Sequence, residues 1–310
     1  MNLLGSSSWR IVGWNVLFIV LLLSMGTPFG LITTGFIMIP LLYMYVRTNI
    51  KLFAAHYAVA LILVYILTGL VFPGWFGALL LAIALFFLPP VIQMGNLYKK
   101  KAPARSVMTV GAVTLLCELL LSLVISYGFG FNWVEKMKQF MRESLDTLPA
   151  SLKGMIPMDA DLVVQLTAQM LPLYMIGFSL FYAVFTHWLA RKALVRSGEM
   201  IPAFRPVREW MLPRSFVWYY LVALIMEYFV KDPNSILFTI LINLVPILSF
   251  AFALQGIALL FFIAYRKKWN KALPIIGIIL FIVFPPTYFL LSLLGLFDVA
   301  FPLRDRLTKK

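Results

Sequence analysis

The sequence predicts an all-α integral membrane protein, a polytopic helical bundle of about nine transmembrane helices. Hydrophobic residues make up 62% of the 310-residue chain and charged residues only 12%, with a mean hydropathy of +0.94. A soluble fold would need a more polar surface than this composition supplies. The apolar residues form long continuous runs without the alternation of barrel strands, and most charges fall between the runs. Membrane-spanning helices are the structure that fits all three observations.

Breaks at proline, glycine and charged residues divide the chain into apolar segments close to the ~20 residues that cross the hydrocarbon core. Arg10 before the first segment resembles the start of a signal peptide. No Ala-x-Ala-like cleavage site follows it, so we expect this segment to be retained as the first span. We expect one integral membrane domain, 1–310, with spans near residues 11–26, 30–46, 52–72, 75–95, 106–127, 168–190, 215–230, 235–265 and 272–297.

The basic residues predict the orientation, because lysine and arginine are in excess in cytoplasmic loops. With the N-terminus inside, the loops of that side contain Arg10, Arg47, Lys51, Lys99, Lys100, Lys101, Arg105, Arg191, Lys192, Arg196, Arg205, Arg208, Arg214, Arg266, Lys267, Lys268 and Lys271. The opposite loops contain only Lys136, Lys138, Arg142, Lys153 and Lys231. We therefore expect a multi-pass protein of the plasma membrane with a cytoplasmic N-terminus.

The C-terminal tail does not fit nine crossings. They would place Arg304, Arg306, Lys309 and Lys310 outside, although basic residues prefer the cytoplasm. Pro285-Pro286 interrupts the last segment, and adjacent prolines remove helix hydrogen bonds. The alternative prediction is eight spans followed by a re-entrant C-terminal hairpin.

A second Pro-Pro pair follows Leu88 in another apolar span. Interrupted helices in two halves of a chain are typical of transporter binding sites. Kinks or loop ends are the simpler interpretation of both pairs.

Two loops are long enough to have structure of their own. In the extracytoplasmic loop, 128–167, apolar residues recur at helical spacing over 132–148, and Asn132 with Glu135 resembles a capping box. This pattern predicts an amphipathic surface helix, which either links two spans or forms a lid over a cavity. The cytoplasmic loop, 191–214, favours contact with anionic lipid or a cytoplasmic partner through Arg191, Lys192, Arg196, Arg205 and Arg208.

Glu118 is a carboxylate inside the apolar run TLLCELLLS. It lies twelve residues into the span that begins at Ser106, roughly 18 Å from the inner surface of a core ~30 Å thick. An acid at that depth costs roughly 2.5 to 3.5 kcal/mol, so such residues usually face the bundle or a cavity. By the same rise, Gln255 and Asn243 have compatible depths, whereas Glu227 lies closer to the outer surface.

Two interpretations of Glu118 stay open. In the functional one, Glu118 binds a cationic or hydrogen-bonding solute or carries a proton, with Gln255, Asn243 and Glu227 as further polar contacts. In the structural one, a protonated Glu118 donates to Gln255 or Asn243 and holds helices together, a contact worth about 0.6 kcal/mol. That gain is smaller than the insertion cost.

Several functions are not expected. No HExxH, CxxC, Walker-type or GxSxG motif occurs, so we predict no catalytic residues, metal ligands or cofactor. The basic residues lie in loops beside the bilayer, so we predict no nucleic-acid partner. The single cysteine, Cys117, lies in an apolar run and cannot form an intramolecular disulfide.

Three stretches resemble a known family: IMIPLLYMYVRTNIKLFAAHYAVALILVYILTG, LLLAIALFFLPPVIQMGNLYKKKAPARSVMTVGAVTLLCELLL and LLGLFDVAFPLRDRL. They are similar to the YybS-like family of multi-pass membrane proteins (domain of unknown function 2232) from endospore-forming and related bacteria. That family is grouped with the S components of energy-coupling-factor transporters, which capture vitamins or metal ions from outside. This sequence departs from the S components, because it has more spans and no Ala-xxx-Ala in its first helix for docking a coupling subunit. No ligand residues are carried over from them.

The resemblance implies a role in uptake. The first function hypothesis is therefore a solute-binding or transport-related membrane protein without its own ATPase. The alternative is a membrane scaffold that recruits cytoplasmic or envelope partners.

Overall fold

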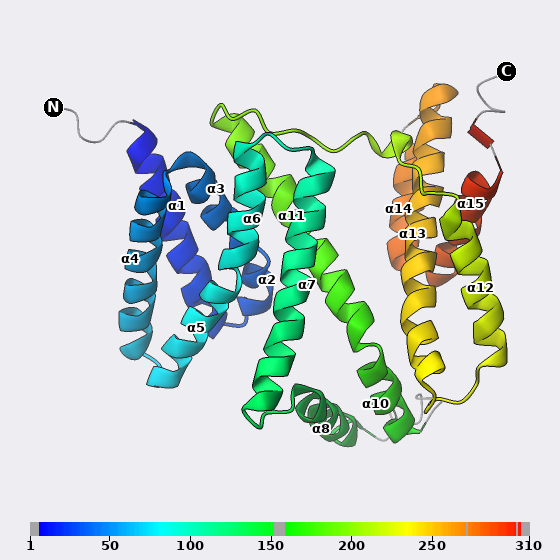
Figure 1. Cartoon of the computed structure of the whole chain (residues 1–310), viewed down its shortest axis with the longest axis horizontal. Helices are drawn as coiled ribbons and strands as arrows, with labels where there is room; N and C mark the ends of the chain where they lie inside the picture. Colours follow the sequence, from blue (N-terminus) through cyan, green and yellow to red (C-terminus); the bar gives the residue numbers. More distant parts are fainter. Residues whose placement is uncertain (1–5, 150, 152–158, 271, 302, 305–310) are drawn as a thin grey trace. The chain divides into compact units, whose positions relative to one another are not determined.

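The computed structural model describes residues 6–149, 151, 159–270, 272–301, 303 and 304, and the regular elements of this part are all helices (Figure 1). The chain folds into two compact units. Unit 1 comprises Met1–Phe131 and Met175–Phe204, and unit 2 comprises Asn132–Tyr174 and Arg205–Lys310. The hydropathy pattern, which predicts one membrane domain, shows no sign of this division.

Unit 1 contains the N-terminal helices and most of a later long helix. They are α1 (Ser6–Leu23), η1 (Ser24–Gly26), α2 (Gly30–Thr34), α3 (Met38–Arg47), α4 (Ile50–Gly69), α5 (Gly74–Phe86), α6 (Leu88–Lys99), α7 (Ala104–Gly128) and α11 (Leu171–Arg196) from Met175 onward. The core lies around α3, whose residues 38–45 are all buried. α3 packs against α1, α4 and α6, and α6 packs against α7.

Hydrogen bonds of buried polar side chains attach α11 to the rest of unit 1. Tyr98 Oη on α6 lies 2.7 Å from His187 Nδ1 on α11. Tyr182 Oη on α11 donates to the backbone carbonyl of Thr34. Tyr98, Tyr182 and His187 are all buried, and these bonds give their polar atoms hydrogen-bond partners in an otherwise apolar interior.

Unit 2 contains α8 (Trp133–Asp146), α10 (Ala160–Gln169), η2 (Val207–Glu209), α12 (Ser215–Phe229), α13 (Ile236–Arg266), α14 (Ala272–Val283) and α15 (Pro285–Ala300). The long helix α13 packs against α12, α14 and, most extensively, α15. Gly256 and Gly295 lie at the α13–α15 contact. A Cβ on Gly256 would collide with the Leu291 carbonyl, and one on Gly295 with the Phe252 carbonyl. The absence of a side chain at both positions lets the two backbones approach this closely.

Side-chain caps begin three of the helices. The amide oxygen of Asn49 accepts from the backbone N–H of Leu52 at 2.8 Å at the start of α4. Ser235 caps α13 in the same way. Asn132 caps α8 by accepting from the backbone N–H of Glu135 at 3.2 Å, which confirms the helix start predicted from the sequence.

Both Pro-Pro pairs begin new helices. Pro89-Pro90 lies in the first turn of α6, directly after α5, and Pro285-Pro286 lies in the first turn of α15, directly after α14. Proline is tolerated in a first turn because the N–H that it lacks has no intrahelical acceptor there. The prolines therefore divide two apolar segments into pairs of shorter helices.

α14 and α15 form a hairpin beside α13. The 12 residues of α14 extend about 18 Å, less than the ~30 Å hydrocarbon core. After α15 the chain has returned to the C-terminal end of α13, where the guanidinium of Arg304 lies 5.2 Å from the ring centroid of Phe262. A hairpin of two short helices is compatible with the alternative prediction, in which a C-terminal hairpin replaces a ninth full crossing.

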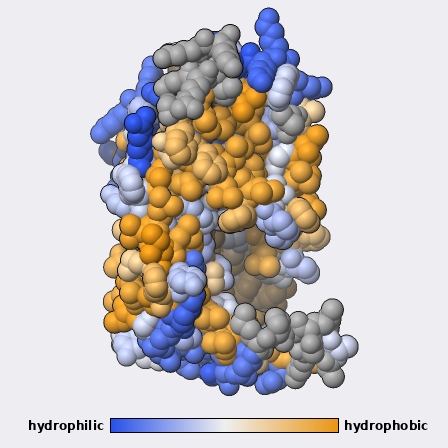
Figure 2. All heavy atoms as spheres, turned by 90° about the vertical axis from the view of Figure 1, so that its right-hand side faces the viewer, coloured by the Kyte–Doolittle hydropathy of each residue, from blue (hydrophilic) through white to orange (hydrophobic). Residues whose placement is uncertain are grey.

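Among the described residues, seven segments are long and apolar enough to cross a membrane: Trp9–Gly26, Gly30–Arg47, Ile50–Gly69, Gly74–Lys99, Ala104–Gly128, Leu171–Arg196 and Ile236–Arg266. Ser215–Phe229, Pro274–Val283 and Pro285–Ala300 are shorter apolar helices. Figure 2 shows apolar side chains over most of the middle of one face, with hydrophilic side chains gathered toward its two ends. The protein is thus an all-α, polytopic membrane protein, as its composition predicts.

Candidate functional site

Glu118 continues the buried face of α7. Val107, Gly111 and Leu115 are buried and recur every four residues, and Glu118 follows Leu115 by three. Glu118 lies fourteen residues after Ala104, the first residue of α7, which is about 21 Å along the helix. The carboxylate is therefore far from both ends of the helix and turns toward the side on which α7 packs.

The Glu118 side chain is half-buried. Oε2 is buried and has no hydrogen-bond partner in the described part of the chain. The other acidic residue of unit 1, Glu199, is paired with Arg47 at 2.6 Å. A buried carboxylate oxygen without a donor is energetically unfavourable, and a proton, a cation or a hydrogen-bonding solute would each supply what it lacks.

Asn243 of α13 satisfies backbone groups at the junction between α10 and α11. Its Oδ1 accepts from the N–H of Leu173 at 2.8 Å. Its Nδ2 donates to the carbonyls of Gln169 at 2.8 Å and Thr239 at 2.7 Å. Groups at helix ends lack intrahelical partners, and one amide side chain supplies them here.

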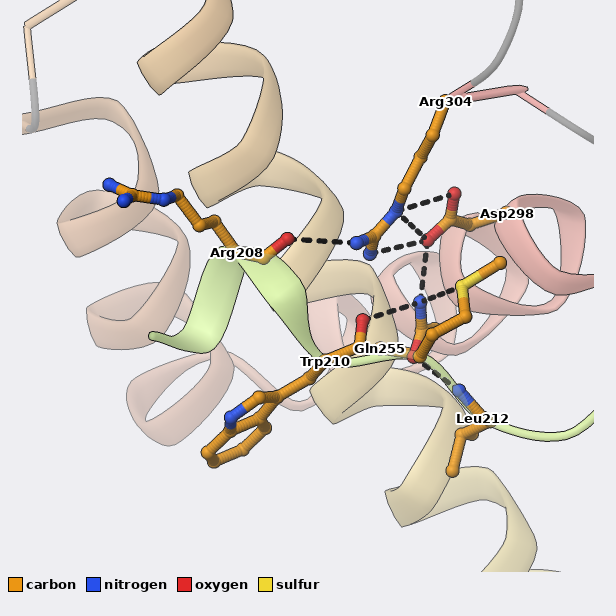
Figure 3. Close-up of polar contacts among 7 residues, drawn as sticks. Arg208, Trp210, Leu212, Gln255, Asp298 and Arg304 are labelled. Atoms are coloured by element: carbon orange, nitrogen blue, oxygen red, sulfur yellow. Dashed lines mark hydrogen bonds and ion pairs between the residues drawn. The ribbon is translucent and has the colours of Figure 1, made fainter. Parts of the chain in front are cut away.

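Gln255 of α13 bonds to the segment between η2 and α12 (Figure 3). Its Oε1 accepts from the N–H of Leu212 at 3.1 Å. Its Nε2 donates to Asp298 Oδ2 at 2.6 Å and lies 3.4 Å from the Trp210 carbonyl oxygen. Both ends of the amide are therefore engaged within unit 2.

Asp298 and Arg304 complete this cluster and were missed by the sequence analysis. Asp298 is fully buried in the last turn of α15, where the helix dipole disfavours a carboxylate. Arg304 compensates by donating to it through Nε at 3.0 Å and Nη2 at 2.8 Å, and its Nη1 donates to the Arg208 carbonyl at 2.8 Å. The only signal in the sequence is that an acid lies six residues before an arginine. The predicted last span, 272–297, ends before both residues and so places them outside the membrane.

Glu227 lies apart from both amides. Its side chain is exposed near the C-terminal end of α12, and its backbone carbonyl accepts from Lys231 Nζ at 3.1 Å. Of the four predicted residues, Glu118 belongs to unit 1 and the other three to unit 2. Three separate environments within unit 2, rather than one shared site, contain Asn243, Gln255 and Glu227.

The predicted basic cluster is also divided. Arg191 Nε donates to the Ile201 carbonyl at 3.0 Å, and Lys192 Nζ lies 3.6 Å from the ring centroid of Trp188. Lys192 and Arg196 line a cavity of unit 1, whereas Arg205 and Arg208 belong to unit 2. Among the described residues, no three His, Cys, Asp or Glu side chains are placed to hold a metal ion.

These features define a class: a multi-pass helical membrane protein with a carboxylate held far inside one of its apolar helices. Residues 16–299 match the family described as "Predicted membrane protein (DUF2232)", and the chain belongs to this family. The chain is 26% identical over 277 residues to the uncharacterized protein YybS of Bacillus subtilis (strain 168). This match covers 86% of this chain and 87% of the relative. No solved structure matches. The family resemblance read from the sequence is confirmed.

Proposed function

We propose that the protein binds a small solute within the membrane and serves its transport, without an ATPase of its own. Glu118 is the residue that contacts the solute or carries a coupled proton. The proposal assigns no catalytic step to the protein. It rests on one observation, the buried carboxylate oxygen of Glu118 that has no partner among the described residues.

A comparison of costs supports this role. An acidic residue near the centre of a bilayer costs roughly 2.5 to 3.5 kcal/mol, which is large beside a typical interhelical hydrogen bond of about 0.6 kcal/mol. A carboxyl group that only held helices together, whether ionised or protonated, would be expected to have hydrogen-bond partners around it. A cationic or hydrogen-bonding solute would complete the coordination of Glu118.

The breaks at the two Pro-Pro pairs are compatible with this proposal. α5 and α6 are separated at Phe87, and α14 and α15 at Phe284. Interrupted membrane helices are typical of transporters, although the backbone N–H groups of Phe87 and Phe284 are bonded here, to the carbonyls of Ile83 and Leu280. The resemblance of this family to S components, which is a resemblance only, would imply the same function.

We propose the plasma membrane as the location, with the N-terminus in the cytoplasm. In unit 1, cationic side chains gather at one end: Arg47 pairs with Glu199, Lys99 donates to the Thr48 carbonyl, and Arg10 and Arg196 line one cavity. We call this the basic end of unit 1. The excess of cations in cytoplasmic loops assigns it to the cytoplasmic side.

A scaffold that recruits a cytoplasmic partner is the second candidate. Arg304 bonds to η2 at the Arg208 carbonyl and Gln255 bonds to the next segment at Leu212, yet Trp210 and Met211 remain 38% and 51% exposed. A fixed backbone that presents an aromatic and a methionine side chain suits protein recognition. This role needs no solute.

Ligand-dependent thermal stability distinguishes the two functions, because a ligand that binds the folded state raises its stability. The purified protein is screened against small cationic and polar metabolites, and hits are repeated on Glu118→Gln. Glu143→Gln, a change at an exposed acid of α8, is the matched control. We expect a solute that stabilises the wild type and the control but not Glu118→Gln. Equal stabilisation of all three proteins would contradict the role of Glu118.

A further inference from the structure

The basic end of unit 1 contains a cavity of about 400 Å³, a volume within the range of small-molecule sites. α1 contributes Arg10 and Trp14, α3 contributes Tyr43, and the C-terminal end of α11 with the residue after it contributes Leu189, Lys192, Ala193, Arg196 and Ser197. Glu118 is not among the lining residues. An inference about this cavity is therefore independent of the proposed solute site.

The cavity has a strong positive charge that no acid in the described part of the chain neutralises. Three of its lining side chains, Arg10, Lys192 and Arg196, are cationic and exposed, and none is acidic. Glu199 follows closely in the chain, but its carboxylate pairs with Arg47 at 2.6 Å. Cations that line one cavity repel one another, and an anion bound between them relieves that repulsion.

The inner wall of the cavity is fixed by packing and hydrogen bonding. Trp14 stacks on Tyr43 with 4.6 Å between ring centroids. Tyr43 Oη lies 2.7 Å from Ser197 Oγ, which joins α3 to the end of α11. Lys192 is held against Trp188, with its ammonium 3.6 Å from the ring centroid. The three cations thus extend from helices, Arg10 from α1 and Lys192 and Arg196 from α11, beside a wall fixed by these contacts.

We propose that this cavity binds a phosphate group, carried either by an anionic phospholipid or by a soluble phosphate compound. Two guanidinium forks and an ammonium match phosphate oxygens in charge and donor geometry. The position also fits, because the cavity opens at the end of unit 1 where helices end and headgroups would lie. The aromatic wall then packs against the part of the ligand next to the phosphate.

The test measures the unfolding temperature of the full chain in two arms. In the first arm, inorganic phosphate is titrated against chloride at equal ionic strength in detergent. In the second arm, the protein is placed in nanodiscs of phosphatidylcholine with increasing phosphatidylglycerol. The test variant is Arg10→Gln with Arg196→Gln. The matched control, Lys51→Gln with Lys100→Gln, removes the same charge from exposed residues of unit 1 that do not line the cavity.

Stabilisation of the wild type is expected in at least one arm. The ligand concentration that gives half of this stabilisation should rise roughly tenfold for each arginine removed and change little in the control. Stabilisation only by phosphatidylglycerol assigns a lipid, and stabilisation by inorganic phosphate assigns a soluble compound. Arg196→Lys, which keeps the charge, should retain part of the effect even if the double variant folds poorly. No stabilisation of the wild type in either arm, or an equal loss in the control, overturns the proposal.

Discussion

Glu118 in unit 1 and Asp298 in unit 2 are both acids on apolar helices, but their surroundings differ. Asp298 is fully buried and accepts hydrogen bonds from Gln255 Nε2 and from two nitrogens of Arg304. Glu118 is half-buried, and its Oε2 has no partner in the described part of the chain. The carboxylate of Asp298, which has a structural role, is thus surrounded by hydrogen-bond donors, and Oε2 of Glu118 is not.

The difference separates stability from function. The Asp298 cluster joins three parts of unit 2, namely α13, α15 and the segment that precedes α12. Losing any member would leave a buried charge or amide unpaired. Glu118 joins no such cluster through Oε2, so its contribution is expected to lie in what it binds.

The largest effect is expected for Arg304→Ala. This change leaves the buried Asp298 carboxylate without its cation, and breaking a buried ion pair costs about 3 kcal/mol or more. Denaturant unfolding of the detergent-solubilised protein measures the loss. Arg142→Ala, which breaks the largely exposed pair with Asp161, is the control and should unfold like the wild type. Wild-type stability of Arg304→Ala would show that the cluster is not structural.

Gly295→Ala is expected to have the next largest effect. The added methyl would collide with the Phe252 carbonyl and push α15 away from α13, at about 2 kcal/mol. Gly177→Ala on α11 is the matched control, because a Cβ there meets nothing within 4 Å. The control should be as stable as the wild type or slightly more stable, since alanine favours helix. Equal behaviour of the two variants in thermal unfolding would argue against close α13–α15 packing.

Glu118→Gln and Asp298→Asn compare the two acids directly. Loss of the Asp298 charge weakens its bonds to Arg304, so Asp298→Asn should lower the free energy of unfolding by about 2 kcal/mol. Glu118→Gln breaks no hydrogen bond of Oε2 among the described residues and should change stability by less than about 1 kcal/mol in either direction. Paired denaturant titrations measure both. A larger loss for Glu118→Gln than for Asp298→Asn would reverse the comparison.

The smallest effect is expected at the Arg47–Glu199 pair. Its side chains are 25% and 35% exposed, and solvent screens such a pair, so Arg47→Gln should cost less than about 1 kcal/mol. The loss should also shrink as salt is added. A salt-independent loss comparable to that of Arg304→Ala would mean that this pair is as important as the buried one.

Hydropathy and local chemistry predict most of the fold. The apolar segments, the capped helix after Asn132 and the interruptions at Pro89 and Pro285 all depend on residues close together in the chain. Glu118 is also identifiable, since a single acid in a long apolar run stands out by its insertion cost. Such features need no knowledge of tertiary contacts.

The partners of the polar residues could not be predicted in this way. Gln255 bonds to a backbone N–H at Leu212, and Asn243 to backbone groups beside the start of α11. Every segment has backbone groups, so composition does not identify which of them a side chain will meet. The Asp298–Arg304 pair forms because the chain turns back after α15, a geometry that the predicted end of the last span concealed.

Thiol accessibility at position 118 tests the central claim most directly. In a Cys117→Ser background, Glu118→Cys is compared with Leu120→Cys, a neighbour on α7 that is 49% exposed and apolar. A charged, membrane-impermeant thiol reagent reacts only with a thiol that water can reach. We predict rapid labelling of Glu118→Cys from one side of the membrane and little labelling of Leu120→Cys. Labelling of Glu118→Cys that is no faster than that of Leu120→Cys would mean that position 118 faces no aqueous cavity.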